Sequence, residues 1–301
     1  MHRVLRAGEG TKNLRTVLSC YDWLARNRFE RDSFLIALGG GVVGDVAGFV
    51  AATYLRGLPF VQVPTTLLAQ VDSSVGGKVG VNLKAGKNLV GAFHQPRIVL
   101  ADLSTLKTLP DREFRAGLAE VIKYGIIHDA DLFARLERDV SRMLRRDRRV
   151  LMDVAARCCE IKAEVVRQDE RESGRRAILN FGHTIGHALE ALGGYSRYLH
   201  GEAIAIGQAA AARISARQLG LPADQVRRVY RLLERAGLPV RVSLTAGQCR
   251  RVLRLMRLDK KARGGELRFV LVKRIGEAVW GQRVPEEVVI ESLRKLATAG
   301  A

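Results

Sequence analysis

The chain has 301 residues, of which 47% are hydrophobic and only 6% aromatic, and its 50 Lys and Arg against 31 Asp and Glu give a formal net charge of +19 at pH 7. No apolar run approaches the ~18 residues of a membrane-spanning helix, which excludes such a span, and the ordinary apolar fraction argues against disorder. The length allows one large domain or two smaller ones, and the charge favours an anionic ligand: nucleic acid, a membrane surface or a phosphorylated metabolite.

The four cysteines are too few for the disulfide framework of a small secreted protein, and they form no C-x-x-C pair. The first ten residues, MHRVLRAGEG, lack the apolar stretch of a secretory signal. We therefore expect a protein of the reducing cytoplasm.

Short apolar runs alternate with a helical pattern in the first third of the chain. Residues 33–38 form a predicted strand, three glycines follow, 45–55 is a predicted helix and 60–63 is the next strand. This order is a β-α-β unit, whose strands are parallel, and residues 98–101 offer a further strand. The N-terminal part, residues 1–109, is therefore predicted to be an α/β domain.

After about residue 110 the apolar residues recur at helical spacing. We expect helices over 111–127, 130–144, 150–167, 184–192, 201–219 and 223–236. Residues 268–272 and a segment near Trp280 could pair as a minor hairpin. The C-terminal part, residues 110–301, is otherwise predicted to be all-α.

A glycine-rich turn joins the first predicted strand to the first predicted helix. Its letters, GGGVVG from residue 39, match G-x-G-x-x-G, in which glycines let backbone N–H groups approach a pyrophosphate at a helix N-terminus. The usual acidic ribose ligand about 20 positions later is missing. The strand and helix around it favour phosphate binding over a plain tight turn.

The segment from Pro64 to Pro96 mixes glycines with polar and basic side chains. Lysine suits phosphate as a compact charge, and open α/β sheets bind ligands beyond the carboxyl ends of their strands. The alternative is a glycine-rich surface loop with incidental lysines. The polar residues are Thr65, Thr66, Asp72, Lys78, Lys84, Lys87 and Asn88.

Three of the six histidines, His183, His187 and His200, fall within eighteen residues. His183 and His187 are four apart, so both face one side of a helix. Imidazole is a common zinc ligand, and a catalytic zinc has three protein ligands and one open position. If only two histidines bind, a carboxylate completes the set, and Glu120 is a candidate. Core histidines with ordinary helix-surface partners are the alternative.

Five segments together resemble one enzyme family, the 3-dehydroquinate synthases of the shikimate pathway, and the similarity runs from Gly8 to about Gly276. The segments are GGGVVGDVAGFVAATYLRG (39–57), VPTTLLAQVDSSVGGKVGVNLKAGKNLVGAFHQP (63–96), RAGLAEVIKYG (115–125), RRAILNFGHTIGHALE (175–190) and LHGEAIAIG (199–207).

The resemblance implies a Rossmann-like NAD domain, here incomplete, over residues 1–109 and an all-α metal- and substrate-binding domain over 110–301. It implies a carbon-oxygen lyase that converts 3-deoxy-D-arabino-heptulosonate 7-phosphate to 3-dehydroquinate and phosphate, with NAD and zinc or cobalt. Oxidation by NAD would precede β-elimination of phosphate, re-reduction, ring opening and an intramolecular aldol step. A homodimer is also implied.

The resemblance further implies three sets of site residues. The metal would be held by Glu120, His183 and His200. The NAD site would comprise Glu9, Lys12, Gly40, Gly41, Val42, Asp45, Thr65, Thr66, Asp72, Lys87, Thr108, Leu109 and Glu113. The substrate would meet Arg56, Asp72, Lys78, Asn88, Lys123, Lys162, Arg176, Asn180, His187 and one of Lys260 and Lys261.

Family members carry about fifty to sixty further N-terminal residues, which hold the first strands of the NAD domain. Either the start codon is assigned too late, or a real truncation weakens NAD binding. The intact chemical residues downstream favour the first explanation. In either case we expect apolar sheet surface to be exposed in this chain.

Three other functions compete with this one. A related sugar phosphate cyclase would act on another heptulose phosphate or on glucose 6-phosphate, and an inactive homologue would do neither. A nucleic-acid-binding protein would use the net charge, and the best local candidate is the cluster Arg145, Arg146, Arg148 and Arg149. The chain is aromatic-poor and its arginines are dispersed, so we interpret this cluster as a solvated helix end and expect neither nucleic acid nor a membrane as partner.

Overall fold

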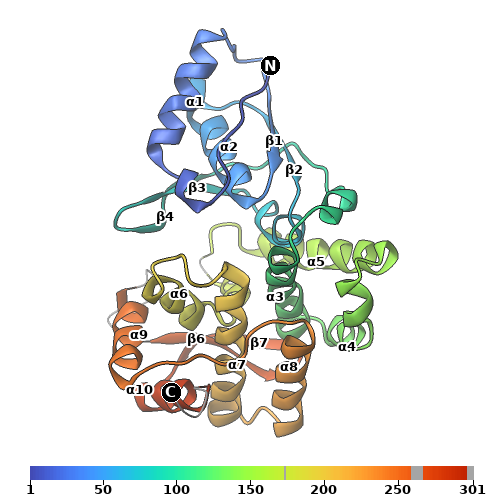
Figure 1. The fold of residues 1–301 in the computed structure, drawn as a ribbon, viewed down its shortest axis with the longest axis vertical. Helices are drawn as coiled ribbons and strands as arrows, with labels where there is room; N and C mark the ends of the chain where they lie inside the picture. The colour runs from blue at the N-terminus through green and yellow to red at the C-terminus, as the bar shows by residue number, and fades with distance from the viewer. Residues whose placement is uncertain (173, 259–266, 297–301) are drawn as a thin grey trace. The chain divides into compact units, whose positions relative to one another are not determined.

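The computed structural model describes residues 1–172, 174–258 and 267–296. The chain folds into two compact units, Met1–Pro110 and Asp111–Ala301, which are coloured blue to green and green to red in Figure 1. The predicted boundary fell one residue earlier. That the first unit binds NAD and the second binds the metal stays a prediction.

A three-stranded parallel sheet forms the centre of the first unit, as the β-α-β pattern predicted. Its strands are β1 (Leu35–Gly39), β2 (Phe60–Pro64) and β5 (Ile98–Val99), in the order β1-β2-β5. Helix α2 (Gly41–Thr53) connects β1 to β2 and packs on one face of the sheet. Helix α1 (Leu14–Arg26), which was not predicted, completes a core with α2 and β2.

The segment expected to be a loop contains an antiparallel hairpin of β3 (Lys78–Leu83) and β4 (Gly86–Phe93). Gly80 lies opposite Gly91, and a Cβ on either one would lie 2.6 or 2.4 Å from a carbonyl oxygen of the facing strand. The two backbones therefore approach too closely for any other residue. The two strands were not predicted, because glycine is depleted in strands and indicates a turn when it is found in a sequence.

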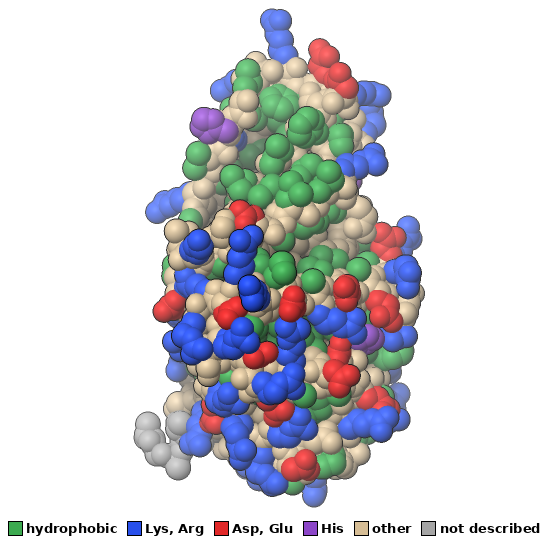
Figure 2. Space-filling model, turned by 90° about the vertical axis from the view of Figure 1, so that its right-hand side faces the viewer, with side chains coloured by type: hydrophobic (Ala, Val, Ile, Leu, Met, Phe, Trp, Pro, Cys, Tyr) green, Lys and Arg blue, Asp and Glu red, His purple; other side chains and the backbone are tan. Residues whose placement is uncertain are grey.

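The other face of the parallel sheet is apolar and exposed. The side chains of Phe34, Ile36 and Leu38 are 58, 60 and 64% exposed, and Ile98 across the sheet is 52% exposed. Ile36 pairs with Val61, and Val61 with Ile98, so these residues share one face. Figure 2 shows hydrophobic side chains gathered on the upper part of the view, which belongs to the first unit. Parallel sheets are normally covered on both faces, and a bare one favours association.

We predict that the double substitution Ile36→Thr and Leu38→Thr reduces concentration-dependent self-association, measured by light scattering. Threonine suits a strand, and surface substitutions usually change stability by less than about 0.5 kcal/mol, so the melting temperature should hardly move. Met152→Thr is the control, because Met152 is 54% exposed but lies in the second unit. Equal association of the double variant and the wild type would contradict the prediction.

The second unit is mainly helical, and the six predicted helices agree with the structure within two residues. Two additional helices, α9 and α10, were not predicted. Side chains at the helix starts explain several boundaries: Asp129 accepts a hydrogen bond from the N–H of Leu132, and Asp147 from that of Val150. The helices are α3 (Asp111–Ile127), α4 (Ala130–Leu144), α5 (Arg148–Gln168), α6 (His183–Leu192), α7 (His200–Leu219), α8 (Ala223–Arg235), α9 (Ala246–Leu258) and α10 (Glu286–Leu296).

A hairpin of β6 (Arg268–Arg274) and β7 (Glu277–Arg283) confirms the predicted pairing near Trp280. Strand β6 is buried against α7, where the N–H of Val272 donates to the hydroxyl of Ser215 at 3.0 Å. The unit is therefore not all-α, because this hairpin is part of its core.

Helix α7 is the central element of the second unit. It contacts α3, α6, α8, α10 and β6, and its residues from Ala203 to Ala212 are buried. Small side chains along this helix let five neighbours pack around it. Figure 1 shows α7 among these elements.

No helix in the described part of the chain is long and apolar enough to cross a membrane. The four cysteines are thiols, and three of them, Cys20, Cys158 and Cys249, are buried.

Candidate active site

Three helices of the second unit come into backbone contact at glycines. A Cβ on Gly201 would lie 1.8 Å from the carbonyl oxygen of Ala116 in α3, and one on Gly207 would lie 2.0 Å from that of Gly182, the residue before α6. Gly182 itself has φ 81°, a left-handed conformation that glycine adopts readily. Helix α7 can therefore lie directly against both α3 and the start of α6.

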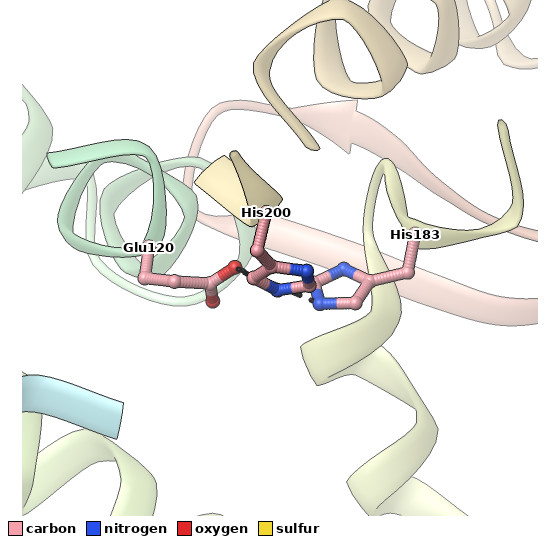
Figure 3. A group of neighbouring side chains, drawn as sticks. All are labelled: Glu120, His183 and His200. Carbon is pink, nitrogen blue, oxygen red and sulfur yellow. Dashed lines mark ion pairs between the residues drawn. The ribbon is translucent and has the colours of Figure 1, made fainter. Parts of the chain in front are cut away.

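These contacts bring Glu120, His183 and His200 together from three separate helices (Figure 3). The Glu120 side chain is fully buried, and its Oε1 lies 3.6 Å from Nε2 of His183 and 3.7 Å from Nε2 of His200. Each of the three offers a ligand atom within 4.8 Å of the others. The sequence predicted this set, and the structure brings its members together.

The donor set fits a divalent metal such as zinc. With zinc–ligand bonds of about 2.0–2.2 Å, the ligand atoms of a tetrahedral site are about 3.3–3.6 Å apart, close to the separations found around Glu120 Oε1. Nδ1 of His183 lies 3.2 Å from the carbonyl oxygen of Phe181. A proton on Nδ1 donated to that oxygen leaves the Nε2 lone pair available for a metal.

His200 carries a proton in the metal-free protein at neutral pH. Burial alone would lower its pKa, but hydrogen bonds and charge from Glu120 and Glu190 outweigh burial and raise the pKa to about 10. A metal that binds Nε2 must displace this proton. The affinity for metal therefore rises as the pH is raised toward the pKa of about 10.

Three cations are buried in the same unit: Lys123, Lys162 and Arg176. Lys123 forms an ion pair with Glu120, and the guanidinium of Arg176 donates to the carbonyl oxygen of Glu170. They lie on α3, α5 and the 3-10 helix Arg175–Asn180, which pack on one another. Buried cations are costly unless anionic groups face them, so a group of them on adjoining elements indicates an anionic ligand or partner.

Two further predicted site residues, Asn180 and His187, have partners within the second unit. Asn180 Nδ2 donates to Glu172 Oε1 at 2.6 Å, and the His187 ring lies 5.2 Å from that of His183 and 6.0 Å from that of His200. The sequence singled out neither Glu172 nor Glu190, whose Oε2 is 3.3 Å from Nδ1 of His200. Glu190 is the last residue of the recognised segment 175–190 and Glu172 lies just before it, so neither had a sequence signal beyond its acidic side chain.

In the first unit the glycine turn packs closely against the residues that follow β2, and we call Gly40, Gly41, Thr65 and Thr66 the cradle. A Cβ on Gly40 would lie 3.0 Å from the methyl group of Thr66, and one on Gly41 would lie 3.1 Å from the hydroxyl of Ser73. The N–H of Thr65 donates to the carbonyl oxygen of Gly39 at 2.9 Å. Gly40, Gly41, Thr65 and Thr66 therefore meet at the start of α2, where backbone N–H groups favour an anion.

Two residues near the N-terminus, Glu9 and Lys12 in the segment GEGTK (8–12), contact the same region. Buried Lys12 forms an ion pair with Asp45 on α2. Asn82 Nδ2 donates to Glu9 Oε1 at 2.7 Å, and Asn82 Oδ1 accepts from the N–H of Asn88 at 2.9 Å. Asn82, which the sequence analysis missed, therefore links Glu9 to the β3–β4 hairpin.

The other predicted residues are more dispersed. In the first unit, Val42 is on α2, exposed Arg56 is in the 3-10 helix Tyr54–Arg56, Asp72 is in the π-helix Ala69–Ser73, Lys78 opens β3, Lys87 is on β4, and Thr108 and Leu109 follow the 3-10 helix Leu103–Lys107. Glu113 is in the first turn of α3, in the second unit. Lys260 and Lys261 lie outside the described residues.

Comparison with known proteins identifies the family. The family model for the 3-dehydroquinate synthase N-terminal part matches residues 2–116, and that for the C-terminal part matches residues 117–262. The chain is 54% identical over 290 residues to a 3-dehydroquinate synthase of Nitrosospira multiformis, covering 96% of this chain and 79% of the relative. It is 56% identical over 269 residues to that of Geobacter metallireducens, covering 89 and 74%. The chain belongs to the 3-dehydroquinate synthase family.

Solved structures of related cyclases share the fold of this family member. A 2-epi-5-epi-valiolone synthase from Streptomyces hygroscopicus subsp. jinggangensis with NAD+ and Zn2+ bound is 29% identical, with a TM-score of 0.91, over 97% of this chain and 81% of that one. A 2-deoxy-scyllo-inosose synthase complexed with carbaglucose-6-phosphate, NAD+ and Co2+ is 30% identical, with a TM-score of 0.83, over 96% of this chain and 81% of that one.

We predict that Gly201→Ala weakens zinc binding and lowers the free energy of unfolding by about 1–3 kcal/mol, since overpacking separates α7 from α3. Zinc affinity and chemical denaturation measure the two effects. Gly247→Ala in α9 is the control, because its Cβ would meet nothing closer than Thr245 Oγ1 at 3.8 Å; its stability should stay within about 1 kcal/mol of the wild type. Unchanged zinc affinity in Gly201→Ala would contradict the role of this contact.

Proposed function

We propose that this chain is a 3-dehydroquinate synthase, which converts 3-deoxy-D-arabino-heptulosonate 7-phosphate to 3-dehydroquinate and phosphate with NAD and a divalent metal. The observation that carries the proposal is the cluster of buried Glu120, buried His183 and partly buried His200, with buried Lys123 paired to Glu120, in a member of this family. A homodimer is part of the proposal.

Glu120, His183 and His200 would hold the metal, zinc or cobalt, and leave one position open for substrate. A metal held there would supply polarisation of the substrate hydroxyl whose carbon is oxidised, and NAD would accept the hydride. The protein supplies a buried carboxylate, a buried imidazole and a partly buried one, already positioned next to one another, and electrostatic interactions are stronger there than in bulk water.

The cradle at the start of α2 would hold the cofactor. Backbone N–H groups at Gly40 and Gly41 suit a pyrophosphate, and Asp45 suits a ribose hydroxyl. Lys12 would keep the Asp45 carboxylate oriented, because the two form an ion pair in which Lys12 is buried.

Basic residues would bind the two acidic ends of the substrate. Arg56, Lys78 and the amide of Asn88 would bind phosphate, for which lysine and arginine are the usual partners. Lys123, Lys162 and Arg176 would bind the carboxylate and hydroxyls. Asn180 and His187 would contact substrate hydroxyls beside the metal.

Phosphate release from the heptulosonate phosphate, assayed with the purified chain, NAD and zinc, tests the proposal. We expect release that requires both NAD and metal and that stops when a chelator is added. If this chain is inactive, the assay is repeated with an upstream extension of the reading frame. Inactivity of both forms would contradict the lyase assignment.

A related cyclase is the second candidate, supported by the TM-score of 0.91 to the 2-epi-5-epi-valiolone synthase. The same assay with glucose 6-phosphate and a heptulose phosphate lacking the carboxylate separates the two. We expect little turnover of either compound, since each lacks the carboxylate that the buried cations would bind. Faster turnover of one of them would favour the second candidate.

We predict that His183→Ala loses stoichiometric zinc, because two ligands remain where three are needed. Elemental analysis after dialysis measures the metal. His128→Ala is the control, since His128 lies 3.6 Å from Glu164 outside the cluster. Full zinc content in His183→Ala would reject the ligand assignment.

A further inference from the structure

We infer that Glu190 is a positioning residue of the metal site: its carboxylate holds His200 through Nδ1 and directs Nε2 toward the metal. This inference rests on the proposed metal site. It concerns a residue that is not itself a ligand of that site.

Glu190 lies on α6, seven residues after His183, so both are on one helix face. Its side chain is only 3% exposed, and its Oε2 lies 3.3 Å from Nδ1 of His200. On the opposite side of the ring, Nε2 of His200 lies 3.7 Å from Glu120 Oε1. The imidazole therefore lies between two buried carboxylates from two different helices.

A metal-binding imidazole is neutral and carries one proton, on the nitrogen that does not bind the metal. The Glu190 carboxylate accepts that proton's hydrogen bond at Nδ1, so the lone pair is on Nε2. The carbonyl oxygen of Phe181 does the same for His183. Both histidines thus present Nε2 to the same oxygen of Glu120, and the group that accepts from Nδ1 of His200 is a charged carboxylate.

The charge of Glu190 adds a second effect. A carboxylate hydrogen-bonded to a ligating histidine makes the imidazole a stronger donor, and loss of such a partner typically weakens metal affinity about 10–100-fold. Glu190 also adds a second buried negative charge beside Glu120, whose own charge is shared with Lys123. This second charge lowers the cost of placing a divalent ion there.

A different use of the same residues is a separate metal site. His187, Glu190 and His200 also have ligand atoms within 4.8 Å of one another. A metal there would take Nδ1 of His200, and filling both sites would require His200 to lose both ring protons. The hydrogen-bond role needs no such deprotonation and is therefore the one we infer.

The experiment compares Glu190→Gln and Glu190→Ala with the wild type in the full chain. Zinc affinity is measured by competition with a chelator, and the visible spectrum of the Co2+-loaded protein reports ligand geometry. We expect about a 10–100-fold weaker affinity in Glu190→Ala and a smaller loss in Glu190→Gln, whose amide oxygen still accepts from Nδ1. The Co2+ spectrum should change in Glu190→Ala.

Glu164→Gln is the matched control, because Glu164 also faces a histidine, His128 at 3.6 Å, but lies outside the cluster. Thermal unfolding of the metal-free proteins separates positioning from folding. If Glu190→Ala does not fold, the zinc affinity and the Co2+ spectrum of the near-isosteric Glu190→Gln test the inference in its place.

Wild-type affinity and spectrum in the folded Glu190 variants would overturn the inference and leave the proposed function standing. Two zinc ions per wild-type chain, one of them lost in Glu190→Ala, would overturn it in favour of a second metal site. A wild-type chain that binds no zinc would overturn both the inference and the proposed metal site.

Discussion

The close approach of helix α7 to α3 and to the start of α6 is the constraint on which the second unit depends. Only glycine at positions 201 and 207 allows it, because a Cβ would lie 1.8 or 2.0 Å from a backbone oxygen. The approach places His200 and His183 around Glu120, a carboxylate with no exposed surface. A buried carboxylate is costly unless cations surround it, and Lys123, the imidazoles and a metal together would meet that need.

The two units are organised on different principles. In the first, glycines bring backbone donors to the start of α2, and the side chains Lys12 and Asp45 are held by an ion pair. In the second, side chains from separate helices converge on one carboxylate. Fixed N–H groups suit a phosphate-bearing cofactor, whereas imidazole and carboxylate suit a metal. On the face shown in Figure 2, basic side chains over the second unit are interspersed with acidic ones. The chemically informative cations are therefore the buried ones, and the net charge says little about function.

Much of this organisation was readable in the sequence. Apolar spacing located α3 to α8 within two residues, and clustered histidines indicated candidate metal ligands, because both signals are local. The β3–β4 hairpin was missed because Gly80 and Gly91 are required by the facing strand and not by local turn chemistry. Asn82 was missed because its partner Glu9 is 73 residues away in sequence, and Glu190 because nothing in its neighbouring sequence marks it as the partner of His200. An exposed apolar sheet surface was predicted, but the residues that form it, such as Ile36 and Leu38, could be identified only from the strand register.

Diffraction from crystals of the zinc-loaded protein, recorded on both sides of the zinc absorption edge, tests the central claim most directly. We predict one anomalous peak per chain, about 2.0–2.2 Å from a Glu120 oxygen and from Nε2 of both His183 and His200. Nδ1 of His200 should remain hydrogen-bonded to Glu190. A peak bonded to Nδ1 of His200, or zinc bound away from Glu120, would contradict the arrangement.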